Sequence, residues 1–385
     1  MTDRVAYQRG GHRRMTYRRM LLAVVAGLLG ALATAAPAAA HAADTPDGSN
    51  YASAVRGLTP AVPGLRVRLV EGGARLELEN RTGRTIEVLG YAGEPYLEVR
   101  SDGVYENGNS PATYLNRTLA GETPPIGTDP TRPPQWRRIG TEPVVRWHDQ
   151  RTRWLEDGPP ARVAAAPDRP QRVRDWTVPL RDGGTTVQVR GTLDWVPPPD
   201  PLPWWAGVVF GALVVGGLGL LPRASRPGRR ATVVLAGVAG TGGLAALAYA
   251  LARGADAGFG GMLAGLVTNQ LWPTLTGVAA LVTAVHVLTR QRPAADFVLT
   301  LAGTCLALFA GVTNASVFLR SVLPVPWPAG YARVLVAIVL AAGFGLAAAG
   351  ALRLHTAARH GRPVPPTRAR WSAGTGLEGE PAGRR

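Results

Sequence analysis

The sequence predicts a membrane protein in which an antiparallel β-sandwich-like domain precedes an all-α bundle of five transmembrane helices. Three observations lead to this prediction. Residues 43–200 contain no long apolar run and show strand-like alternation, whereas residues 201–354 are almost continuously apolar. The amino terminus is basic and then apolar, which predicts that the β-domain is exported.

Residues 1–42 have the composition of a secretory signal peptide. "GHRRMTYRRM" is basic, "LLAVVAGLLGALATAA" is apolar, and "PAAAHAAD" supplies the small residues that precede a cleavage site. Cleavage after Ala40 and cleavage after Ala42 both obey the small-residue rule, and an uncleaved anchor helix is a third alternative. Only cleavage after Ala40 makes His41 the first residue of the mature chain.

Two segments of the predicted β-domain read as hairpins. "ARLELENRTGRTIEVLG" alternates apolar and polar residues on both sides of the turn "NRTGR". "DWTVPLRDGGTTVQVRGTLDWVP" repeats the pattern around a glycine-containing turn at residues 181–184. Its second strand places four apolar residues on one face: Val187, Val189, Leu193 and Trp195. Together with shorter strands, these hairpins predict a small sandwich or barrel of immunoglobulin-like character.

Five apolar segments are long enough to cross a bilayer of roughly 30 Å. They lie near residues 203–222, 231–252, 269–289, 296–317 and 331–352. Glycines four residues apart, such as Gly207 and Gly211, predict close helix packing. Arginine-rich sequence follows the first, third and fifth segments, and residues 355–385 form a basic tail that we expect to be disordered. The positive-inside rule then predicts a multi-pass plasma-membrane protein with the β-domain outside and the tail in the cytoplasm.

The composition narrows the classes of function. The formal charge is +16, from 42 basic and 26 acidic residues, yet the chain contains no lysine. A Walker-type phosphate loop, a Ser-x-x-Lys pair and a Schiff-base lysine are therefore excluded. The arginines cluster in the loops and at the termini, so we expect the lipid bilayer, and not nucleic acid, as a partner. We expect no enzymatic activity, because no catalytic constellation is visible, and the absence of mid-helix acids disfavours transport.

The stretch "RWHDQRTRWLEDG", residues 146–158, concentrates aromatic and charged side chains. One interpretation is structural, with indole rings and guanidinium groups packed together. Another is a site for an anion or a glycan, because arginine binds carboxylate or phosphate bidentately and tryptophan stacks on sugars. The candidate ligand-binding residues are Arg146, Trp147, Arg151 and Trp154.

A third interpretation is a metal site. His41, as a mature amino terminus, would supply two nitrogens, His148 a third nitrogen and Asp149 an oxygen, a set that suits Cu(II). This layout distantly resembles the copper-resistance proteins of bacterial envelopes, which combine an exported β-sandwich with histidine-lined helices. The resemblance implies copper as a cofactor, held by His41, His148 and Asp149.

The chain also resembles a group of multispan membrane proteins of actinobacteria. The resemblance lies in "LENRTGRTIEVLGYAGEPYLEV", "SPATYLNRT", "DWTVPL" and the five predicted helices. It implies an exported domain and a plasma-membrane location, and it carries no activity.

The sequence therefore predicts a non-catalytic integral membrane protein that presents an exported β-domain to an envelope protein or a cell-wall ligand. The alternative is the handling of copper or another metal ion through His41, His148 and Asp149. The mature amino terminus separates the two, because cleavage after Ala42 removes His41.

Overall fold

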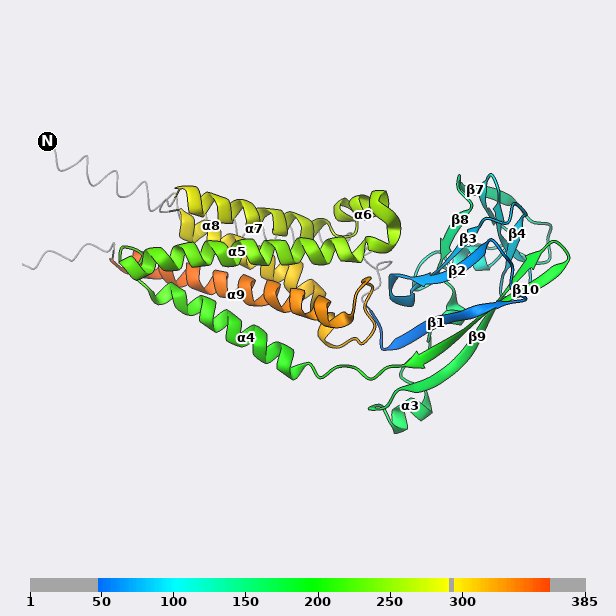
Figure 1. Cartoon of the computed structure of the whole chain (residues 1–385), viewed down its shortest axis with the longest axis horizontal. Helices are drawn as coiled ribbons and strands as arrows, with labels where there is room; N and C mark the ends of the chain where they lie inside the picture. The colour runs from blue at the N-terminus through cyan, green and yellow to red at the C-terminus, as the bar shows by residue number, and fades with distance from the viewer. Residues whose placement is uncertain (1–47, 291–293, 361–385) are drawn as a thin grey trace, which may run out of the picture.

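A β-domain and a helical bundle lie end to end along the long axis of the molecule (Figure 1). The computed structural model describes residues 48–290 and 294–360. Strands between residues 51 and 195 form the β-domain, and the bundle begins at Leu202. The predicted fold class, an antiparallel β-rich domain followed by helices, is confirmed. The expected signal peptide, with His41, lies outside the described residues, as does the tail beyond residue 360.

The β-domain consists of two antiparallel sheets of unequal size. Seven strands form the larger sheet, in the order β1-β10-β9-β4-β5-β6-β7, and three form the smaller one, in the order β2-β3-β8. The larger sheet contains β1 (Tyr51–Thr59), β4 (Ile86–Leu89), β5 (Pro95–Arg100), β6 (Gly103–Asn107), β7 (Trp136–Gly140), β9 (Gln171–Asp182) and β10 (Thr185–Trp195). The smaller sheet contains β2 (Leu65–Val70), β3 (Arg75–Asn80) and β8 (Val144–Trp147). This imbalance differs from the expected immunoglobulin-like arrangement, in which the two sheets are of similar size.

Alternating apolar side chains meet between the two sheets. Leu76 and Leu78 of β3 are fully buried and share one core with Val88 of β4 and Val178 of β9. Burial of each such side chain contributes about 1.5–3 kcal/mol. The apolar face predicted for the last strand is also buried, at Val187, Val189, Leu193 and Trp195.

Only one of the two predicted hairpins forms. β9 and β10 pair around the expected turn, with Val178 opposite Val189. β3 pairs instead with β2 and β8, whereas β4 pairs with β5 and β9, so the chain changes sheet between them. Asn80 holds this corner, because its side-chain amide donates to the carbonyls of Arg84 and Val99, each at 2.7 Å. The prediction of a hairpin there was wrong, since alternation looks the same in a hairpin and in a corner.

Five helices of the bundle are long and apolar enough to cross a membrane: Leu202–Leu220, Arg226–Arg253, Leu271–Arg290, Ala295–Phe318 and Ala329–Ala358. They comprise α4 (Leu202–Gly217), α5 (Arg226–Arg253), α7 (Leu271–Arg290), α8 (Ala295–Cys305) and α9 (Ala329–His360). α4 ends in η3 (Leu218–Leu220), and α8 continues through the π-helix η5 (Leu306–Gly311) and the 3-10 helix η6 (Val312–Phe318). These positions lie within a few residues of those expected from the sequence, although α9 continues past Leu354, where the tail was expected to begin.

The helices pack closely at glycines, although not at every glycine that the spacing suggested. Around Gly207 a Cβ atom would meet open space, and at Gly211 it would lie 3.0 Å from Ala341. Gly343 of α9 lies against a neighbouring backbone, since a Cβ there would lie 2.6 Å from the backbone nitrogen of Ala307. Backbones that touch in this way are typical of helices packed within a membrane.

A buried charge cluster lies at the end of the bundle far from the β-domain, which we call the distal end. Asp296, the second residue of α8, forms ion pairs with Arg223 at 2.9 Å and with Arg353 of α9 at 3.5 Å. Arg353 is 3% exposed and also donates to the hydroxyl of Thr232 on α5 at 2.8 Å. The cluster therefore joins three helices and the loop after α4, and no local sequence pattern indicates it.

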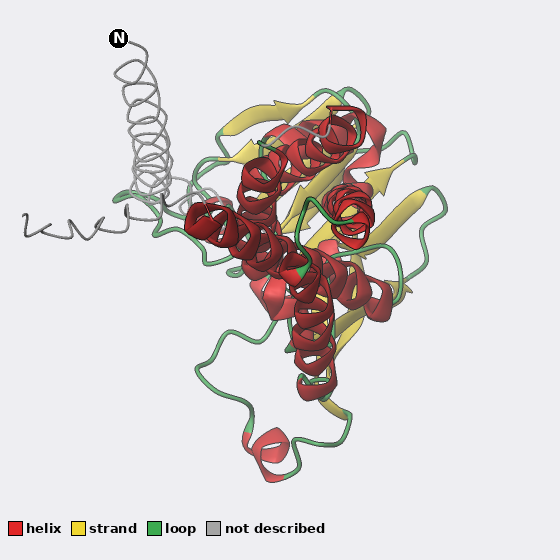
Figure 2. Cartoon of the chain, turned by 90° about the vertical axis from the view of Figure 1, so that its left-hand side faces the viewer, coloured by secondary structure: helices red, strands yellow, loops and turns green. Residues whose placement is uncertain are grey.

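The opposite, β-proximal end of the bundle meets the β-domain directly. Ser49 pairs with Val322 as an isolated antiparallel bridge, and the backbone N–H of Ser321 donates to Oδ1 of Asn50 at 2.9 Å. The short helices η4 (Ala255–Ala257) and α6 (Gly258–Val267) stand at this end. Figure 2 shows the helices in front of the sheets when the molecule is seen along its long axis from the bundle side.

Candidate functional site

The side chains of residues 146–158 enter different surroundings and do not form one site. Arg146, in β8, donates through Nε to Oε2 of Glu77 at 2.6 Å and through Nη2 to the backbone carbonyl of Asp256. It thus joins the β-domain to the bundle. Trp147 is 3% exposed, packs in the sandwich core and donates from Nε1 to Oδ2 of Asp149 at 3.0 Å.

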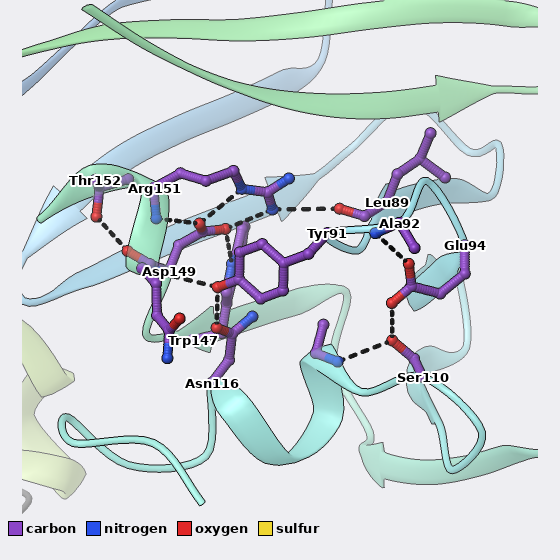
Figure 3. A network of polar contacts seen from close by, with 12 residues as sticks. Leu89, Tyr91, Ala92, Glu94, Ser110, Asn116, Trp147, Asp149, Arg151 and Thr152 are labelled. Atoms are coloured by element: carbon purple, nitrogen blue, oxygen red, sulfur yellow. Dashed lines mark hydrogen bonds and ion pairs between the residues drawn. The ribbon is translucent and has the colours of Figure 1, made fainter. Parts of the chain in front are cut away.

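Asp149 is the centre of a polar network inside the β-domain (Figure 3). It is fully buried and accepts hydrogen bonds from Nε and Nη2 of Arg151, both at 2.8 Å, and from the backbone N–H of Arg151 at 3.1 Å. Arg151 also donates to the carbonyl of Leu89, at the end of β4. A bidentate pair of this kind fixes geometry, so Arg151 links the 3-10 helix η2 (Gln150–Thr152) to the larger sheet.

Tyr91 extends this network. Its hydroxyl donates to Oδ1 of Asn116 and accepts from the backbone N–H of Gln150 at 3.0 Å, and the guanidinium of Arg151 lies 4.9 Å from its ring centre. Burial, assisted by the charge of Asp149, raises the pKa of Tyr91 to about 12. The phenol therefore stays neutral near pH 7 and serves as a structural hydrogen-bonding group.

His148 is also held by protein groups. Its Nδ1 lies 2.9 Å from the carbonyl of Ala74, and its Nε2 accepts from Nε of Arg75 at 3.0 Å. Both carboxylate oxygens of Asp149, the other expected metal ligand, accept hydrogen bonds from Arg151. Within residues 48–290 and 294–360 there is no group of three or more His, Cys, Asp or Glu side chains that could hold a metal ion. His148 and Asp149 are thus bound to protein groups in the described part of the chain, and His41 lies outside it, so the copper site stays a prediction.

Trp154 lines a cleft where the β-domain meets the bundle. The cleft has a volume of about 190 Å³. Its wall is formed by Gly48, Ser49, Tyr51, Ser53, Glu71, Gly72, Gly73, Ala74, Leu119, Thr152, Arg153, Trp154 and Leu193. The rings of Tyr51 and Trp154 are stacked, with centres 6.2 Å apart and planes 22° apart, and form an aromatic part of this wall. We call this the junction cleft.

The polar side chains of the junction cleft differ in whether protein groups satisfy their hydrogen bonds and charges. Ser49 donates to the carbonyl of Tyr51, Ser53 accepts from Nε1 of Trp176, and Thr152 donates to the carbonyl of Asp149. Glu71 pairs with Arg75 at 3.5 Å. Arg153 differs from these, because no described carboxylate pairs with it and its Nη1 is buried without a hydrogen-bond partner in the described part of the chain.

A larger groove, of about 760 Å³, lies beside the edge strands β1 and β2. Three of its charged side chains are already paired, since Arg68 donates to Glu77 at 2.6 Å and Glu79 bonds to Arg81, and the fourth, Arg66, is exposed to solvent. The junction cleft is therefore the better candidate for a binding site, because its arginine still has a donor to satisfy.

The sequence predicted one of the residues that line the junction cleft. Trp154 lies there, whereas Arg146, Trp147 and Arg151 take part in the contacts described above. Arg153 lies within the same quoted stretch and was not selected, because its lack of an acidic partner depends on the fold. Tyr51 gave no signal in the sequence.

Comparison of the chain with protein-family models, with curated proteins and with solved structures finds no match.

Proposed function

We propose that the chain is an integral membrane protein whose exported β-domain binds a small ligand of the cell envelope in the junction cleft. The observation that carries this proposal is the cleft itself, with the stacked rings of Tyr51 and Trp154 beside the half-buried Arg153. Binding sites generally combine an apolar wall with a few polar groups that fix the orientation of the ligand. The junction cleft has both parts.

The size of the cleft limits what it can hold. Its volume of about 190 Å³ is below the range of roughly 300–1,000 Å³ that accommodates drug-sized ligands. A single ring or the end group of a larger molecule fits this space. If the ligand is a cell-wall polymer, only its terminal unit can enter the cleft.

The distribution of arginine supports an exported β-domain. The distal end of the bundle carries Arg223, Arg226, Arg229, Arg230 and Arg290. Trp204 and Trp205 lie in the first turns of α4, at the β-proximal end, where aromatic residues suit a membrane interface. The positive-inside rule then favours an orientation with the distal end in the cytoplasm and the β-domain outside.

The proposed role is recognition and not catalysis. The hydroxyl groups of Ser49, Ser53 and Thr152 are all bonded to other protein groups in the cleft wall. A serine or threonine nucleophile instead needs a base within hydrogen-bonding reach. The arrangement therefore favours a ligand that is bound and released unchanged.

The test uses the purified full chain and small ring compounds of equal size. Benzoate, benzamide and benzamidine share one shape and differ in charge, and phenyl phosphate adds a larger anion. We expect saturable binding of at least one probe to the wild type and to Trp136→Ala, and its loss in Trp154→Ala. Trp136 is the matched control, since it is a partly buried tryptophan on β7 at the far edge of the larger sheet. Saturable binding by none of the four, or binding unaffected by Trp154→Ala, overturns the proposal.

A further inference from the structure

The junction cleft contains an arginine whose charge the described protein does not balance. Arg153 donates from Nη2 to the carbonyl of Leu119 at 2.6 Å, whereas its Nη1 is buried without a partner among the described residues. Burial lowers the pKa of the guanidinium. A buried donor without an acceptor is energetically costly, and more so when it carries a charge. A ligand in the cleft could supply the acceptor that Nη1 of Arg153 lacks.

A second arginine without an acidic partner, Arg174, is hydrogen-bonded to the backbone of the first. Arg174 of β9 donates from Nη2 to the carbonyls of Gln150, Arg151 and Arg153. Its Nε is buried and has no partner in the described part of the chain. In the register of the sheet Arg174 lies opposite Leu193, which lines the cleft.

The neighbouring arginines each have an acidic partner, unlike Arg153 and Arg174. Arg151 is paired with Asp149 at 2.8 Å, and Arg75 with Glu71 at 3.5 Å. Glu71 also lines the cleft, so one wall carries a carboxylate already held by an arginine. Arg153 and Arg174 therefore leave an excess of positive charge beside the junction cleft.

We propose that the junction cleft recognises a ligand bearing a carboxylate or a phosphate group, which Arg153 receives while the ring or apolar part lies against Trp154 and Tyr51. This assignment rests on the proposed function. Arg153 forms part of the cleft wall, and its Nη1 is the donor that an oxyanion in the cleft would satisfy. A guanidinium binds either oxyanion with two parallel hydrogen bonds. Arg174 fixes the backbone of Arg153 and adds its positive charge behind the site.

The test compares the isosteric probes with one another on the full chain. Benzoate is expected to bind at least about tenfold more tightly than benzamide, because a hydrogen bond to a charged group is worth more than a neutral one. Benzamidine, a cation of the same shape, is expected to bind most weakly. Binding of phenyl phosphate alongside benzoate assigns the site to oxyanions in general, and binding of benzoate alone assigns it to carboxylates.

Variants at Arg153 separate the assignment from a general loss of structure. Arg153→Gln is expected to abolish the preference for benzoate, and Arg153→Lys to retain part of it, because lysine keeps the charge but not the planar fork. Arg162→Gln, at an exposed position of the short helix α3 (Ala161–Ala165), is the matched control and should bind as the wild type does.

The outcomes also distinguish the two proposals. Equal affinities for benzoate and benzamide, both lost in Trp154→Ala, overturn the anionic assignment and leave ligand binding in the cleft intact. A benzoate preference that persists in Arg153→Gln overturns the role of Arg153. Binding by none of the probes overturns both proposals.

Discussion

The backbone N–H of Glu71 donates to Oδ2 of Asp256 at 2.7 Å, although the two residues are 185 positions apart in the chain. Glu71 belongs to the turn η1 (Glu71–Gly73) of the β-domain, and Asp256 to η4 at the β-proximal end of the bundle. The backbone carbonyl of Asp256 also accepts from Arg146. Since Glu71 lines the junction cleft as well, the cleft and the contact between the two domains share a wall.

Replacing Asp256 with alanine should loosen η1. The variant removes an ionised acceptor from the N–H of Glu71, and hydrogen bonds to charged groups contribute about 1.5–3 kcal/mol. That loss corresponds to roughly a tenfold or greater increase in local opening. Hydrogen–deuterium exchange at residues 71–73 measures it in the full chain. Asp168→Ala, at an exposed aspartate, is the control, and equal exchange in the two variants would contradict the role of Asp256.

Asp149→Ala should destabilise the whole β-domain. The variant leaves Arg151 and Nε1 of Trp147 without their acceptor in the interior. Removing one partner of a buried ion pair costs about 3–5 kcal/mol. Asp175→Ala breaks an exposed pair with Arg172 and should cost at most about 1 kcal/mol. Denaturant unfolding followed by tryptophan fluorescence compares the two, and similar midpoints would refute a special role for Asp149.

The stability that Glu77 contributes should disappear at low pH. Burial opposes ionisation of Glu77, but hydrogen bonds from Arg68 and Arg146 outweigh it and hold the pKa of this carboxyl below its ordinary value of 4.5. A group whose pKa is lowered by folding stabilises the protein above its unfolded pKa, and this contribution is lost as the pH falls through the folded pKa. We therefore expect wild type to be more stable than Glu77→Gln near neutral pH and the two to converge below pH 4.5.

Unfolding by urea across a series of pH values measures this difference. Glu156→Gln, at an exposed glutamate, controls for the change in net charge. A gap between wild type and Glu77→Gln that stays constant down to the acid limit would show that the ion pairs of Glu77 do not contribute in this way.

Local sequence patterns predicted the parts of the fold that depend on neighbours in the chain. The β9–β10 hairpin follows from two alternating runs joined by Gly183 and Gly184, and the spans follow from the length of their apolar runs. The change of sheet between β3 and β4 could not be predicted, because alternation identifies the buried face and not the partner strand. The side-chain contacts of Asn80 that hold this corner exist only once both sheets are assembled.

The site was less predictable for a related reason. Trp154 could be selected as an aromatic residue in a charged stretch, but the pairing of the arginines could not be read from their spacing. Arg151 turns back onto Asp149, two residues away, whereas Glu156 and Asp157 are exposed and pair with no described arginine, Arg153 included. The cluster around Asp296 could not be predicted from spacing, because its arginines come from the loop after α4 and from α9, which are distant in the sequence.

Gly343→Ala should destabilise the bundle, whereas Gly207→Ala should be tolerated. A Cβ at residue 343 would lie 2.6 Å from the backbone nitrogen of Ala307, so α9 and η5 would have to separate. Small residues of this kind allow helix backbones to touch in a membrane, where dispersion contacts drive association. Overpacking of a well-packed interior typically costs about 1–3 kcal/mol. Around Gly207 a Cβ meets nothing within 4 Å, and alanine favours helix by about 1 kcal/mol over glycine. Thermal unfolding of the two variants in the same detergent compares their stability. A midpoint for Gly343→Ala equal to or above that of Gly207→Ala would show that α9 and η5 accommodate the extra methyl group without loss of stability.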